Sequence, residues 1–569
     1  MGTDNEKTLA SPPFTHELRP LTSIRQYQEK AKMSGPTPAI QHAINAVPLR
    51  YRGPGGALAV VKDGQVIGKR VWGYADQSRR IPVDSSTRFP ICSITKQFVC
   101  GLLVDLQRHP TPAMAAKGDV QKQFADTLNE MLPLAREGLT VQNLCDMQSG
   151  IRDYWALTTL WGAKPDDEFL IDRDCPPMLE KTKSFHFTPG TEYSYSNVNF
   201  YLLGRIIERV TGESLGKLLE ERILKPAGMS TAFLCPNTAH HPPPCVGYEG
   251  NEDLGFFDAV NRMEWSGDAG LVASLEDMIA YEKYLNQLYA DPSSWYHKTA
   301  KLTTFSDGNT ARYHFGLGHV DVNGVESIGH GGALRGYRLH RRHVPEQHLS
   351  VVVMFNHEAD AAAAVDDILR TVLNRPTAES TPVEPAPAWY GAYLDEATQL
   401  AVTVAKSRRP GEVLITYGAH LESAPLKMTD ATSGKSRSMT GSISGDTLQI
   451  HRISENRKLN ARRLVPLDSG LVDPKLAGAY YCDEIESTFY CTGEAGMFYG
   501  TFDGYLGNGI VTSMRYLGDD VWALGCPRGL DASAPGDWTM VFQRDESGTV
   551  SGFKIGCWLA RGLDFVKLK

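Results

Sequence analysis

The sequence lacks any run of 18 apolar residues, and its first residues, MGTDNEKTLASPPF, contain no apolar segment. A transmembrane helix and a secretory signal peptide each need such a run, so we expect neither. The chain also has no excess of basic residues: 58 Lys and Arg stand against 66 Asp and Glu, with a net charge of −8. We therefore expect no binding to nucleic acid or to a membrane surface.

Cysteines are few, with ten in 569 residues and no dense or regular spacing. This usage predicts reduced thiols and a cytoplasmic protein. One cluster, Cys235, His240, His241 and Cys245, could be taken for a zinc site, but its spacing fits no common zinc pattern. Three consecutive prolines within it favour a stiff surface loop. We predict no metal and no cofactor.

A chain of this length exceeds one ordinary core and predicts several domains. Residues 1–45 are polar and are interpreted as an N-terminal extension. Residues 46–375 mix helical and strand patterns, beginning with apolar runs around Asp63-Gly64, a strong hairpin signal. Residues 376–388 are rich in Pro, Ala, Ser, Thr and Glu, as is typical of a linker.

Short strands and turns fill the rest of the chain, which favours antiparallel sheets or barrels. A weak repeat divides this part: "WYGAYLDE" at 389–396 resembles "LAGAYYCDE" at 476–484. We therefore predict two related small β-barrel domains, at residues 389–468 and 474–569.

The string "FPICSITKQF" places Ser93 and Lys96 three residues apart. On a helix these positions share a face, so the lysine can reach the hydroxyl. Serine is a weak nucleophile that needs an adjacent base, and lysine becomes one only where its surroundings lower its pKa. By itself the pattern is weak, because Ser-x-x-Lys occurs at three places: Ser93/Lys96, Ser214/Lys217 and Ser551/Lys554.

The string "FTPGTEYSYSNVNF" offers Tyr195 and Asn197. A tyrosine beside a lysine can carry a proton, and an asparagine amide can orient the lysine and a substrate carbonyl. This pattern is also weak alone, since Tyr-x-Asn recurs at Tyr284 and Asn286 within a helical pattern.

The string "HGGALRGYRLH" places His330, Gly331 and Gly332 before a strand pattern. Glycines allow a substrate backbone to approach a strand edge closely. The N–H group of Ala333 is then a candidate oxyanion donor, with the N–H of Ser93 as the other. Without further context, an ordinary turn is the alternative.

The order Ser-x-x-Lys, Tyr-x-Asn, His-x-Gly, with gaps of 102 and 135 residues, is much rarer than any one motif. With the flanking strings "GGALAVVKDGQ" and "GDAGLVASLEDM", it resembles the penicillin-recognising serine hydrolases of the class C β-lactamase branch. In that family the third motif is usually Lys-Thr-Gly, and His-x-Gly is a variant. The resemblance implies an α/β, β-lactamase/transpeptidase-like catalytic domain at residues 46–375.

Within that family, the chain most resembles the bacterial D-aminopeptidases. The resemblance lies in the segments "SGIRDYWAL", "YSYSNVNF", "GHGGALRGYR", "DASAPGDW" and "GCWLARG". The resemblance implies release of N-terminal D-residues by a homodimer. It implies Ser93 as the acylated nucleophile, Lys96 as its base and Tyr195 as an assistant of base and leaving group. It further implies that Asn197, His330, Gly331 and Ala333 line the substrate.

A Gly-x-Ser-x-Gly string, "GESLG", surrounds Ser214 and is the signature of α/β-hydrolases. That nucleophile elbow needs a strand before it, whereas a helical pattern precedes Ser214. We therefore interpret Ser214 as a helix cap after the break at Gly212.

Three functions remain open: a D-aminopeptidase, amidase or esterase; a β-lactamase or D,D-peptidase; and a silent binding protein. The three intact motifs argue against the last. The loop "CPRGLDASAPGDW" bears on the other two, because in the D-aminopeptidases the matching loop, here 527–537, reaches the active site. Its aspartate, here Asp531, meets the substrate there. An enzyme that requires a free N-terminal amine needs such an anion, and a β-lactamase does not.

Overall fold

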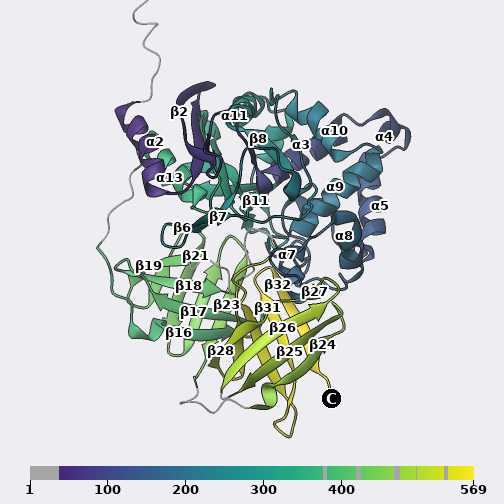
Figure 1. Cartoon of the computed structure of the whole chain (residues 1–569), viewed down its shortest axis with the longest axis vertical. Helices are drawn as coiled ribbons and strands as arrows, with labels where there is room; N and C mark the ends of the chain where they lie inside the picture. The colour runs from purple at the N-terminus through teal and green to yellow at the C-terminus, as the bar shows by residue number, and fades with distance from the viewer. Residues whose placement is uncertain (1–36, 376–380, 418–423, 467–473, 495, 531–535) are drawn as a thin grey trace, which may run out of the picture.

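The computed structural model describes residues 37–569 except 376–380, 418–423, 467–473, 495 and 531–535. Most of the predicted extension and Asp531 thus lie outside the described residues. An α/β domain forms one end of the molecule and two β-barrels lie side by side at the other (Figure 1). Among the described helices, none has the length and apolar character needed to cross a membrane.

An antiparallel sheet forms the centre of the α/β domain. The Asp63-Gly64 hairpin is confirmed, with both residues at positive φ between the first two long strands. In sheet order the strands are β11 (Tyr313–His314), β12 (Leu317–Asp321), β13 (Glu326–Leu334), β14 (Tyr337–Val344), β15 (Leu349–Phe355), β1 (Gly55–Lys62), β2 (Gln65–Asp76) and β3 (Ile81–Pro82).

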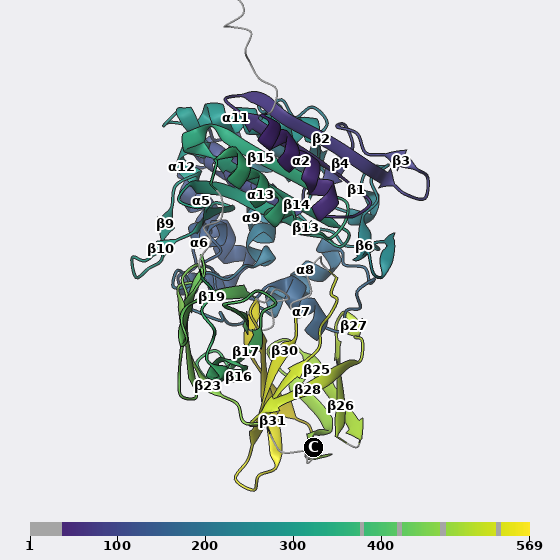
Figure 2. The ribbon, with the colours of Figure 1, turned by 90° about the vertical axis from the view of Figure 1, so that its left-hand side faces the viewer.

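Helices cover both faces of this sheet, so its central strands are apolar on both sides. Along β1, Ala57 and Ala59 face one hydrophobic cluster and Leu58 and Val60 face another. Figure 2 shows α2 (Pro38–Arg50) and α13 (Ala361–Val372) across one face. On the other side lies α11 (Leu275–Ala290), which contains the decoy Tyr-x-Asn as predicted.

A helical lobe extends from that second face. Its central helix, α3, is buried nearly all round, because α9 and α12 pack against it. The helices are α3 (Thr95–Arg108), α4 (Pro112–Ala116), α5 (Val120–Met131), α6 (Val141–Cys145), α7 (Tyr154–Leu160), α8 (Ile171–Glu180), α9 (Asn197–Thr211), α10 (Leu215–Leu219) and α12 (Trp295–Thr299). Small sheets join β4 (Arg88–Pro90), β8 (Leu271–Ser274) and β5 (Phe233–Leu234), β6 (Tyr248–Asn251) and β7 (Gly255–Asp258), and β9 (Thr303–Thr304) and β10 (Thr310–Ala311).

Two boundaries differ from those expected. Helix α2 begins inside the predicted extension, and its Ile40 and Ile44 pack on the sheet, so the α/β domain starts before residue 46. The predicted linker 376–388 also ends early, because Val383 already packs against the first barrel. In both places a short segment packs a few apolar residues against a core. Polar residues surround them in the sequence, so the apolar pattern is too weak to predict the contact.

The C-terminal region consists of two barrels, as the sequence predicts. The first is a closed ring of β16 (Gly391–Asp395), β17 (Leu400–Lys406), β18 (Glu412–Tyr417), β19 (Ala424–Asp430), β20 (Ser433–Lys435), β21 (Met439–Ser444), β22 (Thr447–Arg452) and β23 (Arg457–Arg463). The second comprises β24 (Gly478–Cys482), β25 (Ser487–Glu494), β26 (Met497–Gly504), β27 (Gly507–Asn508), β28 (Thr512–Gly518), β29 (Val521–Leu524), β30 (Trp538–Arg544), β31 (Val550–Cys557) and β32 (Ala560–Lys567). Pairing of β25 with β26 closes this second ring.

The sequence repeat corresponds to a repeated contact at the start of each barrel. In the first barrel, Arg463 lies over the ring of Tyr393, 4.7 Å from its centroid. In the second, Lys567 lies over Tyr480 at 5.5 Å. Each tyrosine hydroxyl also donates to a backbone carbonyl four or five residues upstream. The two barrels therefore share a construction as well as a short motif.

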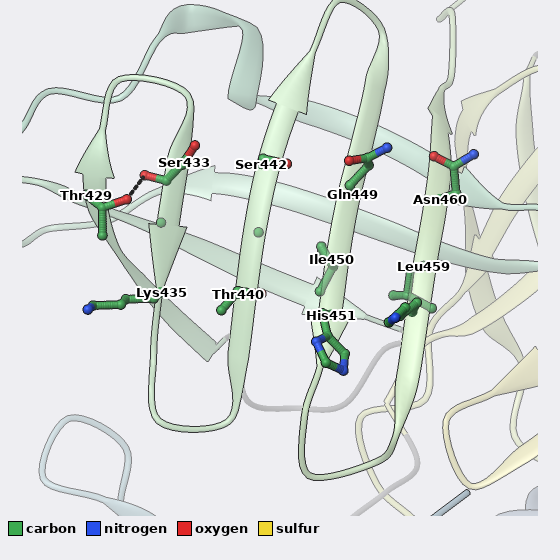
Figure 3. Close-up of a pocket in the computed structure, with 13 residues that line it drawn as sticks. Thr429, Ser433, Lys435, Thr440, Ser442, Gln449, Ile450, His451, Leu459 and Asn460 are labelled. Carbon is green, nitrogen blue, oxygen red and sulfur yellow. Dashed lines mark hydrogen bonds between the residues drawn. The ribbon is translucent and has the colours of Figure 1, made fainter. Parts of the chain in front are cut away.

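A broad polar groove crosses β19–β23 of the first barrel (Figure 3). Thr429, Lys435, Gln449, His451 and Asn460 are among the side chains that line it. No residue of the three motifs lies there, so the chemistry predicted from the sequence belongs to another part of the molecule.

Candidate active site

Ser93 lies in a tight turn between β4 and α3. The turn spans Cys92–Ile94, and α3 begins only at Thr95, so Ser93 precedes the helix that the sequence predicts to contain it. Cys92 has a φ of 51°, a conformation that a non-glycine residue adopts at a cost of about 1–3 kcal/mol. The turn leaves Ser93 half-buried between two buried neighbours, Cys92 and Ile94.

Lys96 is fully buried in the first turn of α3. Its Nζ is 2.9 Å from Ser93 Oγ, 2.8 Å from Asn197 Oδ1 and 2.7 Å from the backbone oxygen of Asp268. Of the three Ser-x-x-Lys motifs, Ser93/Lys96 is thus the one that contacts the Tyr-x-Asn motif, through Asn197. By contrast, Ser214 caps α10 as predicted, and Ser551 lies on β31 in the second barrel.

The second motif lies at the start of α9. Asn197 is buried, and Tyr195 is half-buried with its ring centroid 4.9 Å from Lys96 Nζ. Asp153 orients the asparagine, since one carboxylate oxygen accepts from Asn197 N at 2.7 Å and from its Nδ2 at 3.2 Å. These bonds leave Oδ1 of Asn197 directed at the lysine.

A second buried carboxylate lies behind the lysine. Asp268 is fully buried, and its side chain accepts from Tyr154 Oη at 2.8 Å and from Ser266 N at 2.8 Å. Burial raises the pKa of Asp268, although the charge of Lys96 and the bond from Tyr154 oppose the shift. Sequence reasoning missed Asp153, Tyr154 and Asp268 as site residues. Their signal was present, because all three stand in strings that resemble the family.

The third motif lies on a free length of strand edge. Within the described residues, β12 pairs with β13 only from Glu326 to Gly329, whereas β14 pairs with it as far as Leu334. His330, Gly331 and Ala333 are half-buried on this stretch. A substrate backbone can therefore lie along this edge as an added strand.

Gly332 explains how that edge comes close to the turn of Ser93. A Cβ atom at this position would lie 2.4 Å from the carbonyl oxygen of Ile91 and 3.3 Å from Cys92 Cβ. Only a residue without a side chain lets β13 contact the turn that carries Ser93. The strand edge and the Ser93 turn are thus in contact because position 332 has no Cβ atom.

His330 is held in one uncharged form. Its Nδ1 lies 2.5 Å from the carbonyl oxygen of Gly331, which can only accept, so Nδ1 carries the proton. Nε2 then accepts from Tyr313 Oη at 2.9 Å. Burial, followed by the charge of Lys96, lowers the pKa of His330 to about 3, so the ring is neutral near pH 7. Tyr313 is a further site residue that the sequence did not indicate.

The C-terminal loop begins against the same part of the α/β domain. It connects β29 to β30, and Leu530 is buried. Arg528 Nη2 is 3.1 Å from Glu249 Oε2, and Arg335, two residues beyond Ala333, binds the same carboxylate at 2.9 Å. The start of the loop and the residues just after β13 are therefore joined through Glu249.

The described residues hold no group of three His, Cys, Asp or Glu side chains suited to a metal ion. The geometry is that of a serine hydroxyl, a buried amine and hydrogen-bond donors along a strand edge. Such a set supports nucleophilic acyl transfer.

Comparison with known proteins agrees with this geometry. A β-lactamase family model matches residues 24–374, and a model for domain B of D-aminopeptidase matches residues 382–566. The D-aminopeptidase of Brucella anthropi is 40% identical over 93% of this chain and 98% of its own. The chain belongs to the D-aminopeptidase family. A Brucella melitensis D-aminopeptidase is 39% identical over 93% of this chain and 99% of its own.

One solved structure shows the fold alone. The octameric penicillin-binding protein homologue from Pyrococcus abyssi superposes with a TM-score of 0.51 and 17% identity. The match covers 82% of this chain and 98% of that one. The β-lactamase-like fold predicted for the catalytic domain is confirmed by the family model, and the two barrels by the strand order.

The close packing at Gly332 generates a test. Gly332→Ala should push β13 away from the Ser93 turn and lower kcat/KM by about 100-fold, the usual cost of misplacing a catalytic group by about 1 Å. Gly318→Ala on β12 is the matched control, because its Cβ would meet the nearest oxygen at an ordinary 3.5 Å. Steady-state hydrolysis by the two variants makes the comparison. Equal rates would mean that the edge does not act on the substrate.

Proposed function

We propose that the chain hydrolyses peptides, amides or esters with an N-terminal D-residue, through an acyl-enzyme on Ser93. The contact between Lys96 Nζ and Ser93 Oγ, made while two other acceptors hold the nitrogen, carries the proposal. The D stereochemistry rests on membership of the D-aminopeptidase family.

In the proposed acylation, Lys96 is the base. A neutral amine has two N–H bonds, and the oxygens of Asn197 and Asp268 can only accept, so both bonds point to them. The lone pair then faces Ser93 Oγ and takes its proton as the oxygen attacks the carbonyl carbon. The proton passes to the leaving amine with help from Tyr195, and water reverses these steps to release the acid.

Two backbone N–H groups are proposed to hold the developing oxyanion, those of Ser93 and Ala333. Preorganised donors of this kind contribute about 3–4 kcal/mol each to the lowering of the barrier. The close contact of β13 with the nucleophile's turn supports this assignment, as does the half-buried position of both residues.

The neutral His330 favours a peptide or amide substrate over a penicillin. A penicillin, or a peptide ending in D-Ala, has a carboxylate close to the reacting carbonyl. An uncharged imidazole gives that anion no ion pair, and both of its nitrogens are already hydrogen-bonded, to Gly331 and to Tyr313. The β-lactamase and D,D-peptidase alternatives therefore fit this site less well, whereas the esterase alternative is left to the substrate comparison below.

We also propose that Asp531, outside the described residues, pairs with the substrate ammonium, as the resemblance implies. The attachment of Arg528 to Glu249 supports this role, because it directs the start of the loop toward the end of β13, the strand proposed to bind the substrate. We further propose a cytoplasmic homodimer. The cysteine usage supports the location, and the family resemblance alone supports the dimer.

Four substrates test the function directly. The purified chain should hydrolyse D-Ala-p-nitroanilide much faster than L-Ala-p-nitroanilide, N-acetyl-D-Ala-p-nitroanilide or nitrocefin. The free amine and the D centre are the features that the proposed site selects. Nitrocefin turnover above that of D-Ala-p-nitroanilide would identify a β-lactamase instead.

Replacing serines separates the three Ser-x-x-Lys motifs. Ser93→Ala should abolish hydrolysis, while Ser214→Ala and Ser551→Ala should retain most of it, because Ser214 caps a helix and Ser551 lies in the second barrel. Mass spectrometry after incubation with a slow ester should find the acyl group on the peptide with Ser93. An adduct on Ser214 would contradict the proposal.

Asp531→Ala tests recognition of the amine. Breaking a buried charge pair costs about 2–5 kcal/mol, so kcat/KM for D-Ala-p-nitroanilide should fall roughly 30-fold or more. The weak rate on the N-acetylated substrate should hold, because that substrate has no ammonium. Wild-type rates on both substrates would remove Asp531 from the site.

A further inference from the structure

The tip of the β31–β32 hairpin, residues 557–561, contacts all three domains. It belongs to the second barrel, yet Trp558 is buried in the hydrophobic core of the first. The carbonyl of Leu559 accepts from Asp153 N at 2.9 Å, in the α/β domain. Figure 1 shows β31 and β32 reaching between the first barrel and α7. Through Asp153 the tip is one hydrogen bond from Asn197.

Glu192 lies where both barrels meet the second motif. It is buried, three residues before Tyr195 and five before Asn197. Arg561, in the hairpin tip, donates two bonds of 3.1 Å to Glu192 Oε2. Arg457, at the start of β23, donates to Oε1. One carboxylate thus binds one guanidinium from each barrel.

Backbone contacts hold the same segment. Tyr193 N donates to the carbonyl of Glu455 in the first barrel at 3.3 Å. Ser194 Oγ donates to the carbonyl of Trp558 in the second at 3.4 Å. Ser194 N donates to the carbonyl of Met147, in the α/β domain, at 3.0 Å. These bonds alternate between domains along the residues just before Tyr195, so movement of a barrel would move the tyrosine.

Removing the carboxylate of Glu192 would be costly, because its partner Arg561 lies beside it in the protein interior. Arg561 is more deeply buried than Glu192, and its guanidinium carbon lies 5.3 and 5.5 Å from the ring centroids of Phe187 and Trp558. Without the carboxylate, two guanidiniums would remain close together with their shared partner gone. Loss of one partner from a buried pair is strongly destabilising, because it leaves an uncompensated buried charge.

We propose that Glu192 is a positioning residue through which both barrels fix Tyr195 and Asn197 against Lys96. The reaction thereby depends on two domains that supply neither the nucleophile nor its base. The inference rests on the proposed function only in taking Ser93 as the nucleophile.

The test compares Glu192→Gln with wild-type full-length chain on D-Ala-p-nitroanilide. Displacement of the second motif should lower kcat by about 10- to 100-fold and change KM by less than about threefold. The rate at which a fluorophosphonate labels Ser93 should fall in parallel. Titration of labelled serine gives the fraction of folded sites, so each rate is expressed per competent site. Glu486→Gln is the control. It also breaks an interdomain ion pair, between Glu486 and Lys181, but this glutamate is exposed.

Coupling tests the assignment to the barrels. Arg561→Gln should lower kcat like Glu192→Gln, and the double variant should be little worse than either, because both act through one contact. Arg561→Lys, which keeps the charge, should recover part of the rate. The proposal would be overturned if Glu192→Gln kept a kcat per competent site within twofold of wild type. Fully additive effects in the double variant would also overturn it.

Failure of the proposed function would look different. A wild-type chain that is labelled at Ser93 but hydrolyses no D-residue substrate would refute the aminopeptidase. The labelling rates of the same variants would still decide the role of Glu192.

Discussion

A fully buried lysine nitrogen needs hydrogen-bond partners inside the protein, and Lys96 takes them from separate elements. Ser93 comes from the turn before α3, Asn197 from the start of α9, and the Asp268 carbonyl from the segment before β8. Leaving such a group unsatisfied costs several kcal/mol. These three parts of the chain must therefore converge whenever the lysine is buried.

Two of these partners are in turn held by neighbouring buried residues. Asp153 turns the asparagine, and Tyr154 holds the carboxyl of Asp268. Gly316 lets its strand connection pass against the lysine, since a Cβ there would lie 2.8 Å from the Lys96 carbonyl carbon. The reacting groups are few, and the buried contacts that orient them extend into every neighbouring element.

The sequence predicted the features that depend on local pattern or on motif order. The hairpin at Asp63-Gly64, the cap at Ser214 and the two barrels follow from turn chemistry and alternating strands. Only the order of the three motifs distinguished Ser93 from Ser214 and Ser551, because each Ser-x-x-Lys is locally ordinary.

The rest depended on contacts between residues far apart in the chain. Tyr313 binds His330 only because β11 and β13 lie in one sheet, with no pattern linking the two positions. Glu192 meets Arg457 and Arg561 across domain boundaries. Helix α2 was missed because one apolar face on a polar segment is visible only with the sheet beneath it.

The hairpin tip also sets an order of events during synthesis. A ribosome completes His330 about 230 residues before it reaches Trp558. At about 5–20 residues per second, roughly 10 to 50 s separate the last motif from the segment that braces the second one. In that interval Ser93 and Lys96 have been made but the contacts from the barrels have not. A nascent chain would thus remain a poor hydrolase while the rest of it is being made.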